Sequence, residues 1–481
     1  MPSYDRSALT AGIVQIGVGN FHRAHQAMYI DRLLNLGLGA DWALWGVSVN
    51  AKPARMLNEL RAQDHLYTLT EKAPDGSRST RVIGSILGFD SAVERPEAVL
   101  ARLADPSTRI IALTITEGGY GIDPATGRFS GAQDPLICED LASAASTASW
   151  LGLIVNALRR RRETGAGPVT IMSCDNIEEN GSVTREALTG FAARVAPDML
   201  EWIDENTSFP SSMVDRVTPG TTPEDHAYLR NAYEIEDEWA VTCEPFTQWV
   251  VEDRFVNGRP DFAAAGVGVV DDVAPFERMK LRLANGTHQS LCFIGALLGF
   301  DYVHEAIADP DIRSLLLRYI DEEAVPTLDA IDGVDFTRWG RTVLERFGNP
   351  QLRDPISRIC AETSDRIPKF LLPVVRDRLA RGLPVETCAA VIASWARYAT
   401  GIDESGAPIV VVDPRRERVM AAASRATRHP IDFLRLTEIF GSLADEPAFV
   451  APFERALWMF HHYGARVSLR ALNAQSVDVN G

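Results

Sequence analysis

The stretch Ile13-Val-Gln-Ile-Gly17-Val-Gly19-Asn20-Phe21-His22 predicts a β-strand, a tight Gly-x-Gly turn and the start of a helix. Two glycines let the backbone turn sharply and approach a pyrophosphate, whose charge is favoured at a helix N-terminus. The third glycine of the usual dinucleotide fingerprint is absent, because His22 occupies its place. A Gly-x-Gly turn alone is weak evidence, but here it follows the first strand of an alternating pattern. The candidate cofactor-binding residues are Gly17, Gly19, Asn20, Phe21, His22 and Arg23.

Strands and helices alternate through the first half of the chain. Strands are predicted at residues 13–16, 43–49, 81–86, 110–116 and 169–173, and helices at 24–36, 54–62, 96–103 and 142–161. This alternation indicates an α/β fold in which a parallel sheet is covered on both faces.

The pattern becomes irregular from about 207 to 274, and helical periodicity dominates after Pro275. A chain of 481 residues exceeds the usual size of one domain. We therefore expect a Rossmann-type dinucleotide-binding domain at 1–275 and a mostly α-helical substrate-binding and catalytic domain at 276–481.

Composition excludes several classes of protein. A net charge of −17 argues against nucleic-acid and anionic-membrane partners, which require a basic surface. The one basic run, 159–162, ends an apolar helical pattern just before Gly165, where cations complement a helix C-terminus. Six scattered cysteines without a CxxC pair indicate neither a zinc site nor a disulfide framework. No signal core or membrane span is evident, so we expect a reduced, cytoplasmic protein.

The acidic residue expected after the second strand, where it would hold a ribose hydroxyl, is missing. Asn50 could make one such hydrogen bond, whereas Lys52 and Arg55 could attract a 2′-phosphate or simply be surface charges. NAD is the first expectation for the cofactor, and NADP stays open.

Two further strands end in polar residues, Glu117 and Asn176. Ligands of open α/β sheets bind beyond the C-terminal ends of the strands, so both side chains are placed to reach one. Asn and acidic residues are also common turn formers, which is an equally good explanation for either residue alone.

A second polar cluster is predicted in the run Lys280-Leu-Arg-Leu-Ala-Asn285-Gly-Thr-His288. At about 100° per residue, an α-helix would place Glu277, Lys280, Asn285 and His288 within an arc of roughly 140°. Most charged stripes are solvated helix faces. This one continues into the apolar run 291–298, which favours an internal site where a Lys, an Asn and a His could perform acid–base and oxyanion chemistry.

Taken together, these segments resemble the polyol-specific long-chain dehydrogenases, the mannitol dehydrogenase family. The resemblance rests on residues 17–25, 113–120, 173–176, 212–216, 243–246 and 280–288, with 367–370 and 411–414 extending it. It implies metal-independent, NAD(P)-dependent oxidation of a secondary alcohol of a linear polyol, with D-mannitol and D-fructose as the first expectation. A mannonate oxidoreductase (fructuronate reductase) or a D-arabinitol dehydrogenase remains an alternative. A dinucleotide-binding sensor without catalysis is an alternative of another class, although it would have no need of a base.

The resemblance also implies roles for individual residues. Lys280 would be the general base, Asn176 and Asn285 the oxyanion site, and His288 a substrate-orienting group. A Lys begins near pKa 10.4, so burial is expected to favour its neutral form, which nearby Glu277 would oppose. Glu117 and Glu277 would connect the base to solvent, Asp215 and Lys369 would line the substrate pocket, and Arg366 and Lys369 are candidates for a cation facing a uronate carboxylate. The family likeness suggests a monomer.

Overall fold

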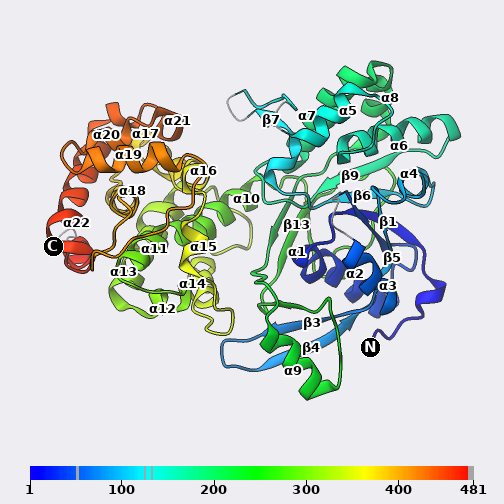
Figure 1. The fold of residues 1–481 in the computed structure, drawn as a ribbon, viewed down its shortest axis with the longest axis horizontal. Coiled ribbons are helices and arrows are strands. Elements are labelled where there is room, and N and C mark those ends of the chain that lie inside the picture. The colour runs from blue at the N-terminus through cyan, green and yellow to red at the C-terminus, as the bar shows by residue number, and fades with distance from the viewer. Residues whose placement is uncertain (50–53, 124–125, 132–133, 475–481) are drawn as a thin grey trace. The chain divides into compact units, whose positions relative to one another are not determined.

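The computed structural model describes residues 1–49, 54–123, 126–131 and 134–474. The chain divides into two compact units, Met1–Ala274 and Pro275–Gly481 (Figure 1). No described helix is long and apolar enough to cross a membrane.

A six-stranded parallel sheet forms the centre of the N-terminal unit. Its order is β10 (Thr207–Ser208), β9 (Val169–Ser173), β6 (Ile110–Leu113), β1 (Ala11–Ile16), β2 (Ala43–Ser48) and β5 (Ile86–Ser91). From β1 the chain builds outward to β2 and β5, and then returns to the other side of β1 to form β6, β9 and β10. The direction of strand order therefore reverses between β1 and β6. This arrangement confirms the expected Rossmann-type fold.

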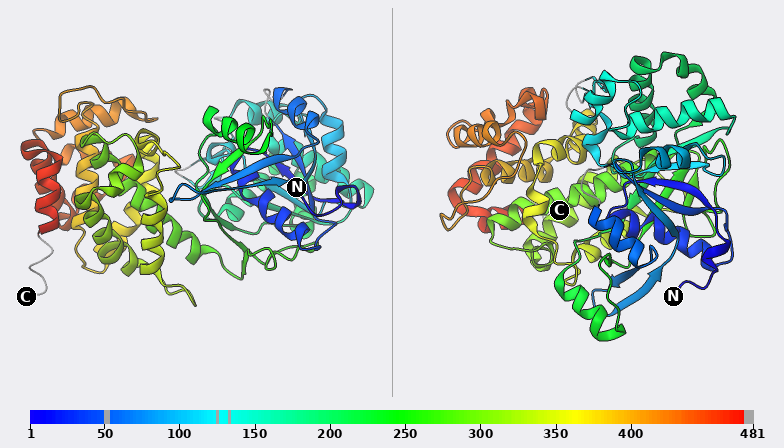
Figure 2. Two further views of the ribbon diagram at one scale, coloured as in Figure 1. Left: turned by 90° about the horizontal axis from the view of Figure 1, so that it is seen from below. Right: turned by 45° about the vertical axis from the view of Figure 1, so that its right-hand side comes forward.

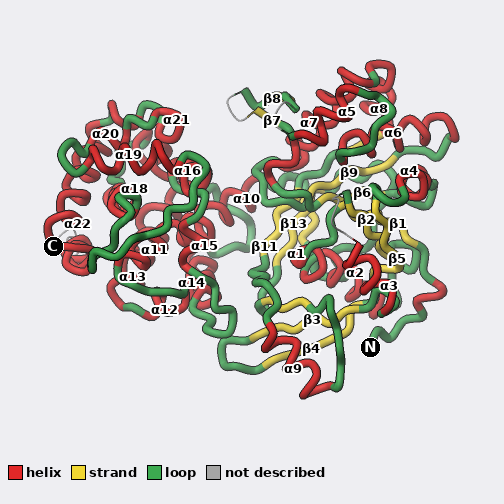
Figure 3. The backbone as a smooth tube through the Cα atoms, in the orientation of Figure 1, coloured by secondary structure: helices red, strands yellow, loops and turns green. Residues whose placement is uncertain are grey.

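Helices cover both faces of this sheet, as Figure 3 shows. Ile13 of β1 packs with α2, whereas its neighbour Val14 packs in a second core with α6. Every residue of β1 is buried, which explains its continuous apolar sequence. The helices of this unit are α1 (Asn20–Ala24), α2 (Gln26–Asn35), α3 (Ala54–Ala62), α4 (Pro96–Ala104), α5 (Pro135–Ala142), α6 (Trp150–Thr164), α7 (Asn180–Val195), α8 (Leu200–Asn206) and α9 (Pro223–Tyr233).

The region expected to be irregular supplies strands to two small sheets. One has the order β12 (Val241–Cys243), β3 (Tyr67–Lys72) and β4 (Arg78–Ile83). The other has the order β11 (Ser212–Asp215), β13 (Gln248–Glu252) and β14 (Gly268–Val270). A short hairpin joins β7 (Ile122–Asp123) to β8 (Arg128–Phe129), and 3₁₀ turns lie at Arg6–Ala8, Glu117–Tyr120 and Pro197–Met199.

Several predicted elements are wrong in extent; the strand expected at 110–116, for example, ends at Leu113. The strand expected at 81–86 covers the end of β4 and the first residue of β5. The helix expected at 142–161 is two helices, because the Asp140 carboxylate accepts the backbone N–H groups of Ala148 and Ser149, and Ser149 caps the start of α6. The predicted end of α6 is confirmed, with Gly165 left-handed at φ 69°. Here Arg161 is fully buried and donates to the carbonyls of Leu103, Asp105, Ala166, Gly167 and Pro168.

The C-terminal unit consists of helices and turns (Figure 2). Its described residues contain no strand, since β14 lies in the N-terminal unit. The almost wholly buried α11 (Gly286–Leu297) packs beside α18 (Glu386–Tyr398) in its core. The other α-helices are α10 (Ala274–Lys280), α12 (Val303–Ala308), α13 (Pro310–Arg318), α14 (Phe336–Phe347), α15 (Ile356–Cys360), α16 (Thr363–Phe370), α17 (Leu372–Ala380), α19 (Arg416–Ala426), α20 (Ile431–Leu434), α21 (Thr437–Phe440) and α22 (Pro447–Ala474). Two π-helical turns lie at Leu281–Asn285 and Tyr319–Ala324, and 3₁₀ turns at Val325–Thr327 and Leu443–Asp445.

Candidate active site

The glycine turn lies at the point where strand order reverses. Gly17 has φ 89°, and a Cβ there would stand 2.0 Å from the Thr114 carbonyl oxygen, so glycine is required. The Thr114 hydroxyl donates to the Gly17 carbonyl at 2.6 Å, which fixes the end of β1 to the end of β6. Gly19 is the N-cap of α1, is exposed, and would carry a Cβ into open space. A tight turn beside an open helix start fits the pyrophosphate of a dinucleotide.

The other predicted cofactor-binding residues differ in their burial. Asn20 and Phe21 are half-buried beside Gly19, whereas His22 and Arg23 are buried. Arg23 donates to the Trp239 carbonyl and to the Asn20 side chain, the latter at 2.6 Å, so it braces the turn from inside. Burial lowers the pKa of His22 to about 3, which keeps its ring neutral. Asn50 and Lys52 lie outside the described residues, as does the side chain of Arg55.

A strained loop follows β6. Thr116 has φ 74°, a conformation that is costly for a β-branched residue. The Asp175 carboxylate, beyond the end of β9, accepts the N–H groups of Ile115 at 3.0 Å and Thr116 at 2.9 Å, and the Tyr120 hydroxyl at 2.7 Å. The loop that leads into Glu117 is thereby held against the segment that carries Asn176. The Asn176 side chain is exposed at this sheet edge. The sequence motif at 173–176 predicts a role for Asn176 but gives no signal for this role of Asp175.

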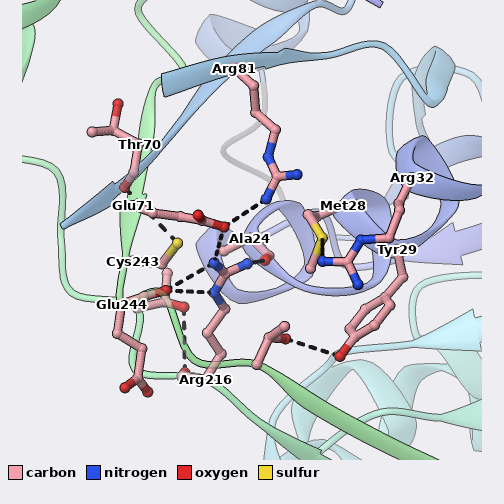
Figure 4. Close-up of polar contacts among 12 residues, drawn as sticks. Ala24, Met28, Tyr29, Arg32, Thr70, Glu71, Arg81, Arg216, Cys243 and Glu244 are labelled. Carbon is pink, nitrogen blue, oxygen red and sulfur yellow. Dashed lines mark hydrogen bonds and ion pairs between the residues drawn. The ribbon is translucent and has the colours of Figure 1, made fainter. Parts of the chain in front are cut away.

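Asp215 is buried at the end of β11, beside the fully buried Arg216. Figure 4 shows the Arg216 guanidinium at the centre of a polar cluster, donating to the Ala24 carbonyl at 2.6 Å and twice to the Glu244 carbonyl. Arg216 also pairs with the Glu71 carboxylate at 2.6 Å. Backbone segments that carry three of the motifs, at 17–25, 212–216 and 243–246, are thus joined by one side chain. No sequence spacing indicated this role for Arg216.

The C-terminal unit carries the Lys-x4-Asn-x2-His segment. Glu277 and Lys280, on α10, are both buried, at 5% and 7% exposure. The helical arc predicted for this segment is wrong in detail, because residues Leu281–Asn285 form a π-helical turn rather than an α-helical one. The Gly286 N–H donates to the carbonyl of Leu281, five residues back. A π-turn brings residue i+5 over residue i, so Asn285 lies one turn above Lys280 on the same face.

Asn285 and His288 complete this segment. The side-chain oxygen of Asn285 is buried and accepts no hydrogen bond from the described residues, which leaves this oxygen able to accept one from a ligand. The His288 ring stacks on Phe347, with centroids 3.5 Å apart and planes 5° from parallel. Its removal from water, together with surrounding cations, holds the pKa of His288 well below 6.5. The ring is therefore neutral at physiological pH and can both donate and accept a hydrogen bond.

Four basic side chains lie near His288: Arg358, Arg346, Arg366 and Lys280. Arg366 donates to the carbonyls of Arg358 and Ile359 and pairs with Glu362 at 3.1 Å, so it braces the α15–α16 connection. Lys369 is exposed on the same helix, α16. Arg346 and Arg358 were not foreseen, because they lie far along the chain from His288 and share no motif with it.

The catalytic and substrate-binding residues predicted from the sequence are divided between the two units. Glu117, whose side chain lies outside the described residues, belongs to the N-terminal unit together with Asn176, Asp215 and the glycine turn, and the remaining residues belong to the C-terminal unit. Within the C-terminal unit, a Lys, an amide and a neutral His are groups that can remove a proton from a hydroxyl group and stabilise the resulting oxyanion. In the described part of the chain, no three His, Cys, Asp or Glu side chains converge as metal ligands.

Comparison with known proteins gives matches over both units. The mannitol dehydrogenase Rossmann domain matches residues 11–264, and the mannitol dehydrogenase C-terminal domain matches residues 272–460. The chain is 42% identical to mannitol 2-dehydrogenase of Neosartorya fischeri over 92% of this chain and 89% of that protein. It is 41% identical to mannitol 2-dehydrogenase of Cereibacter sphaeroides over 98% of both chains.

Solved structures agree with this assignment. A ternary complex of Pseudomonas fluorescens mannitol 2-dehydrogenase with NAD and D-mannitol is 41% identical, with a TM-score of 0.88 over 98% of this chain and 96% of that one. A substrate-free D-sorbitol dehydrogenase is 34% identical, with a TM-score of 0.88 over 97% and 96%. Sequence, fold and both domain matches lead to one conclusion: this chain belongs to the mannitol dehydrogenase family.

Proposed function

We propose that the protein oxidises D-mannitol to D-fructose with NAD, and catalyses the reverse reduction. The observation that carries the proposal is the buried segment 277–288, in which a Lys, an Asn and a neutral His occur together in a member of this family. Support for the substrate and cofactor comes from the relative of 41% identity that was solved with NAD and D-mannitol.

Oxidation of a secondary alcohol removes a proton from the hydroxyl group and a hydride from the carbon that bears it. NAD, when bound at the glycine turn, supplies the hydride acceptor. Lys280 in its neutral form takes the hydroxyl proton, and the amides of Asn285 and Asn176 donate to the oxygen as negative charge develops. The neutral His288 ring orients the substrate hydroxyl.

The remaining predicted residues complete the proposal. Glu277 and Glu117 carry the proton from Lys280 to solvent, and Asp215, Lys369 and Arg366 act in binding the polyol chain. We also propose a monomeric, cytoplasmic enzyme in which the N-terminal unit binds the cofactor and the C-terminal unit supplies the base and most of the substrate-binding residues. Light scattering of the purified protein tests the monomer.

The first experiment measures initial rates of D-mannitol oxidation with NAD and with NADP. D-sorbitol, D-arabinitol and D-mannonate serve as competing substrates. We expect D-mannitol with NAD to give the highest kcat/KM. Turnover of D-mannonate alone would place the protein elsewhere in the family, and NADH binding without any turnover would support the sensor alternative.

The role of Lys280 is tested by Lys280→Ala. We expect turnover to fall more than 100-fold, since acid–base groups contribute about 10²–10⁴-fold, while NADH binding persists. Arg278→Ala is the matched control, because Arg278 lies on the same helix and forms a surface ion pair with Asp329. Near-normal turnover in Lys280→Ala would contradict the assignment.

A further inference from the structure

The two π-helical turns of the C-terminal unit meet at one side chain. Tyr319 begins the second turn, is fully buried, and donates its hydroxyl hydrogen to the carbonyl oxygen of Arg282 at 2.8 Å. Arg282 lies within the first turn, between Lys280 and Asn285. A hydroxyl group from one π-turn therefore contacts the backbone of the other.

The backbone around Arg282 is arranged to receive this hydroxyl. In an α-helix the Gly286 N–H would point to the Arg282 carbonyl, four residues back, but here it bonds to Leu281 instead. A Cβ on Gly286 would lie 2.0 Å from the Tyr319 hydroxyl oxygen, so only glycine leaves room for the phenol. Insertion of a side chain into a helical hydrogen-bond ladder is a recognised cause of local distortion.

The same turn is anchored from a second side. The Arg282 guanidinium donates to the Thr327 carbonyl at 2.9 Å, just beyond the second π-turn, and to Asp377 at 2.7 Å. Both ends of Arg282, backbone and side chain, are thus held by the segment 319–327. This segment is the brace of the first π-turn.

We propose that Tyr319 is a positioning residue for catalysis: its hydroxyl maintains the π-turn that places Lys280 and Asn285 on one face. In an α-helix, residues 283 and 284 would share that face with Lys280, and Asn285 would be turned about 140° away. Single π-turns inside α-helices occur frequently at functional sites. The inference rests on the proposed roles of Lys280 and Asn285.

The test is Tyr319→Phe, which removes the hydroxyl and keeps the ring. We expect kcat for D-mannitol to fall about 10- to 100-fold, because misplacement of catalytic groups by about 1 Å costs up to 10²-fold. KM for D-mannitol and the Kd of NADH should change less than about twofold, and the pH profile of kcat should shift, because Lys280 changes its surroundings. Ser394→Ala is the control, since it removes a buried hydroxyl that donates to the Val391 carbonyl at 2.7 Å on α18. It should keep kcat and its pH profile.

A double-mutant cycle identifies the contact itself. Gly286→Ala should lower kcat more in the Tyr319 background than in Tyr319→Phe, where the closest atom is gone. Additive effects, or a Tyr319→Phe enzyme with unchanged kcat and pH profile, would overturn the inference. If Gly286→Ala does not fold, Tyr319→Phe and its control decide the question alone. An inactive Lys280→Ala with a fully active Tyr319→Phe would reject the positioning role only, whereas an active Lys280→Ala would reject the proposed function.

Discussion

The Asp175 carboxylate accepts a hydrogen bond from the backbone N–H of Thr116 at 2.9 Å, and Thr116 has the positive φ of 74°. A strained residue at the end of one strand is thus held by a carboxylate at the end of its neighbour. Both residues directly precede proposed catalytic side chains, Glu117 and Asn176. Strain of this kind persists only where the surroundings enforce it, and it is concentrated at functional sites.

Replacement of this carboxylate tests its importance. Asp175→Ala removes the acceptor for two backbone N–H groups and for the Tyr120 hydroxyl. Hydrogen bonds to a charged group contribute about 1.5–3 kcal/mol each, so we expect a stability loss of at least this size and a large fall in kcat. Tyr120→Phe removes one of the three bonds and should show a smaller loss of both. Unfolding curves and initial rates provide the measurement, and equal losses would show that the backbone contacts matter little.

Relief of the strain should separate stability from activity. Thr116→Gly allows the positive φ without cost, so we expect the free energy of unfolding to rise by about 1 kcal/mol after the entropic penalty of glycine. Turnover should fall several-fold, because the loop before Glu117 becomes free to move. Thr189→Gly, within helix α7, is the control and should destabilise the protein. A Thr116→Gly protein that is less stable than the wild type would argue against stored strain.

Arg216 is predicted to be a major contributor to the stability of the N-terminal unit. Its guanidinium has 0% exposure and donates to Ala24, Glu244 and Glu71. Arg216→Met should lower the free energy of unfolding by about 2–6 kcal/mol, since the buried carbonyl oxygens of Ala24 and Glu244 lose their donor, at about 1–3 kcal/mol each. Arg81→Met removes the other partner of Glu71, a side chain that is 38% exposed, and should cost less than about 1 kcal/mol. Urea titration compares the two variants, and similar midpoints would refute the distinction.

Stability should fall as the pH drops below 6.5. Burial lowers the pKa of both His22 and His25 from 6.5 to about 3. Between pH 6.5 and pH 3, the unfolded chain therefore binds protons that the native chain does not. Each histidine then reduces the free energy of unfolding by roughly 1.4 kcal/mol per pH unit, and the loss continues until the pH reaches the native pKa. His22→Gln should make the pH dependence shallower. Urea titrations at several pH values from 7 to 5 measure the slope, and an unchanged slope in His22→Gln would contradict the assignment.

Asn285 is predicted to act mainly in the transition state. Asn285→Ala should lower kcat more than it raises KM, with a loss on the order of 2.7–4 kcal/mol in transition-state stabilisation, as for single oxyanion donors. Gln289→Ala, one turn further along α11, serves as the comparison. A raised KM with unchanged kcat would instead make Asn285 a ground-state binding residue.

The sequence was informative where the chemistry is local. Continuous apolar runs between turn residues predicted β1, β2, β6 and β9, and Gly165 predicted the end of α6, because each signal acts within a few residues. The division of the helix expected at 142–161 was missed, since it depends on a carboxylate, Asp140, that accepts N–H groups of the following loop.

Features set by distant contacts could not be predicted. A helical wheel assumes a single period, so it could not foresee the π-turn at Leu281–Asn285. The hydroxyl that contacts this turn belongs to Tyr319, which follows Asn285 by 34 residues (319 − 285). The cations Arg346 and Arg358 near His288 carry no local signal either. Asp175, which lies beyond the end of β9, holds Thr116 at its positive φ, and a β-branched residue gives no sequence signal for such a conformation.

The small sheet β12-β3-β4 has a consequence for synthesis of the chain on the ribosome. Val241 pairs with Leu69 across 172 residues (241 − 69), so β3 and β4 exist long before their third strand. At about 5–20 residues per second, translation leaves that edge of β3 open for roughly 10–30 s. An unpaired strand edge is a template for aggregation, and pairings so distant in sequence form slowly. We therefore expect the nascent N-terminal unit to expose an unpaired strand edge until β12 has been synthesised.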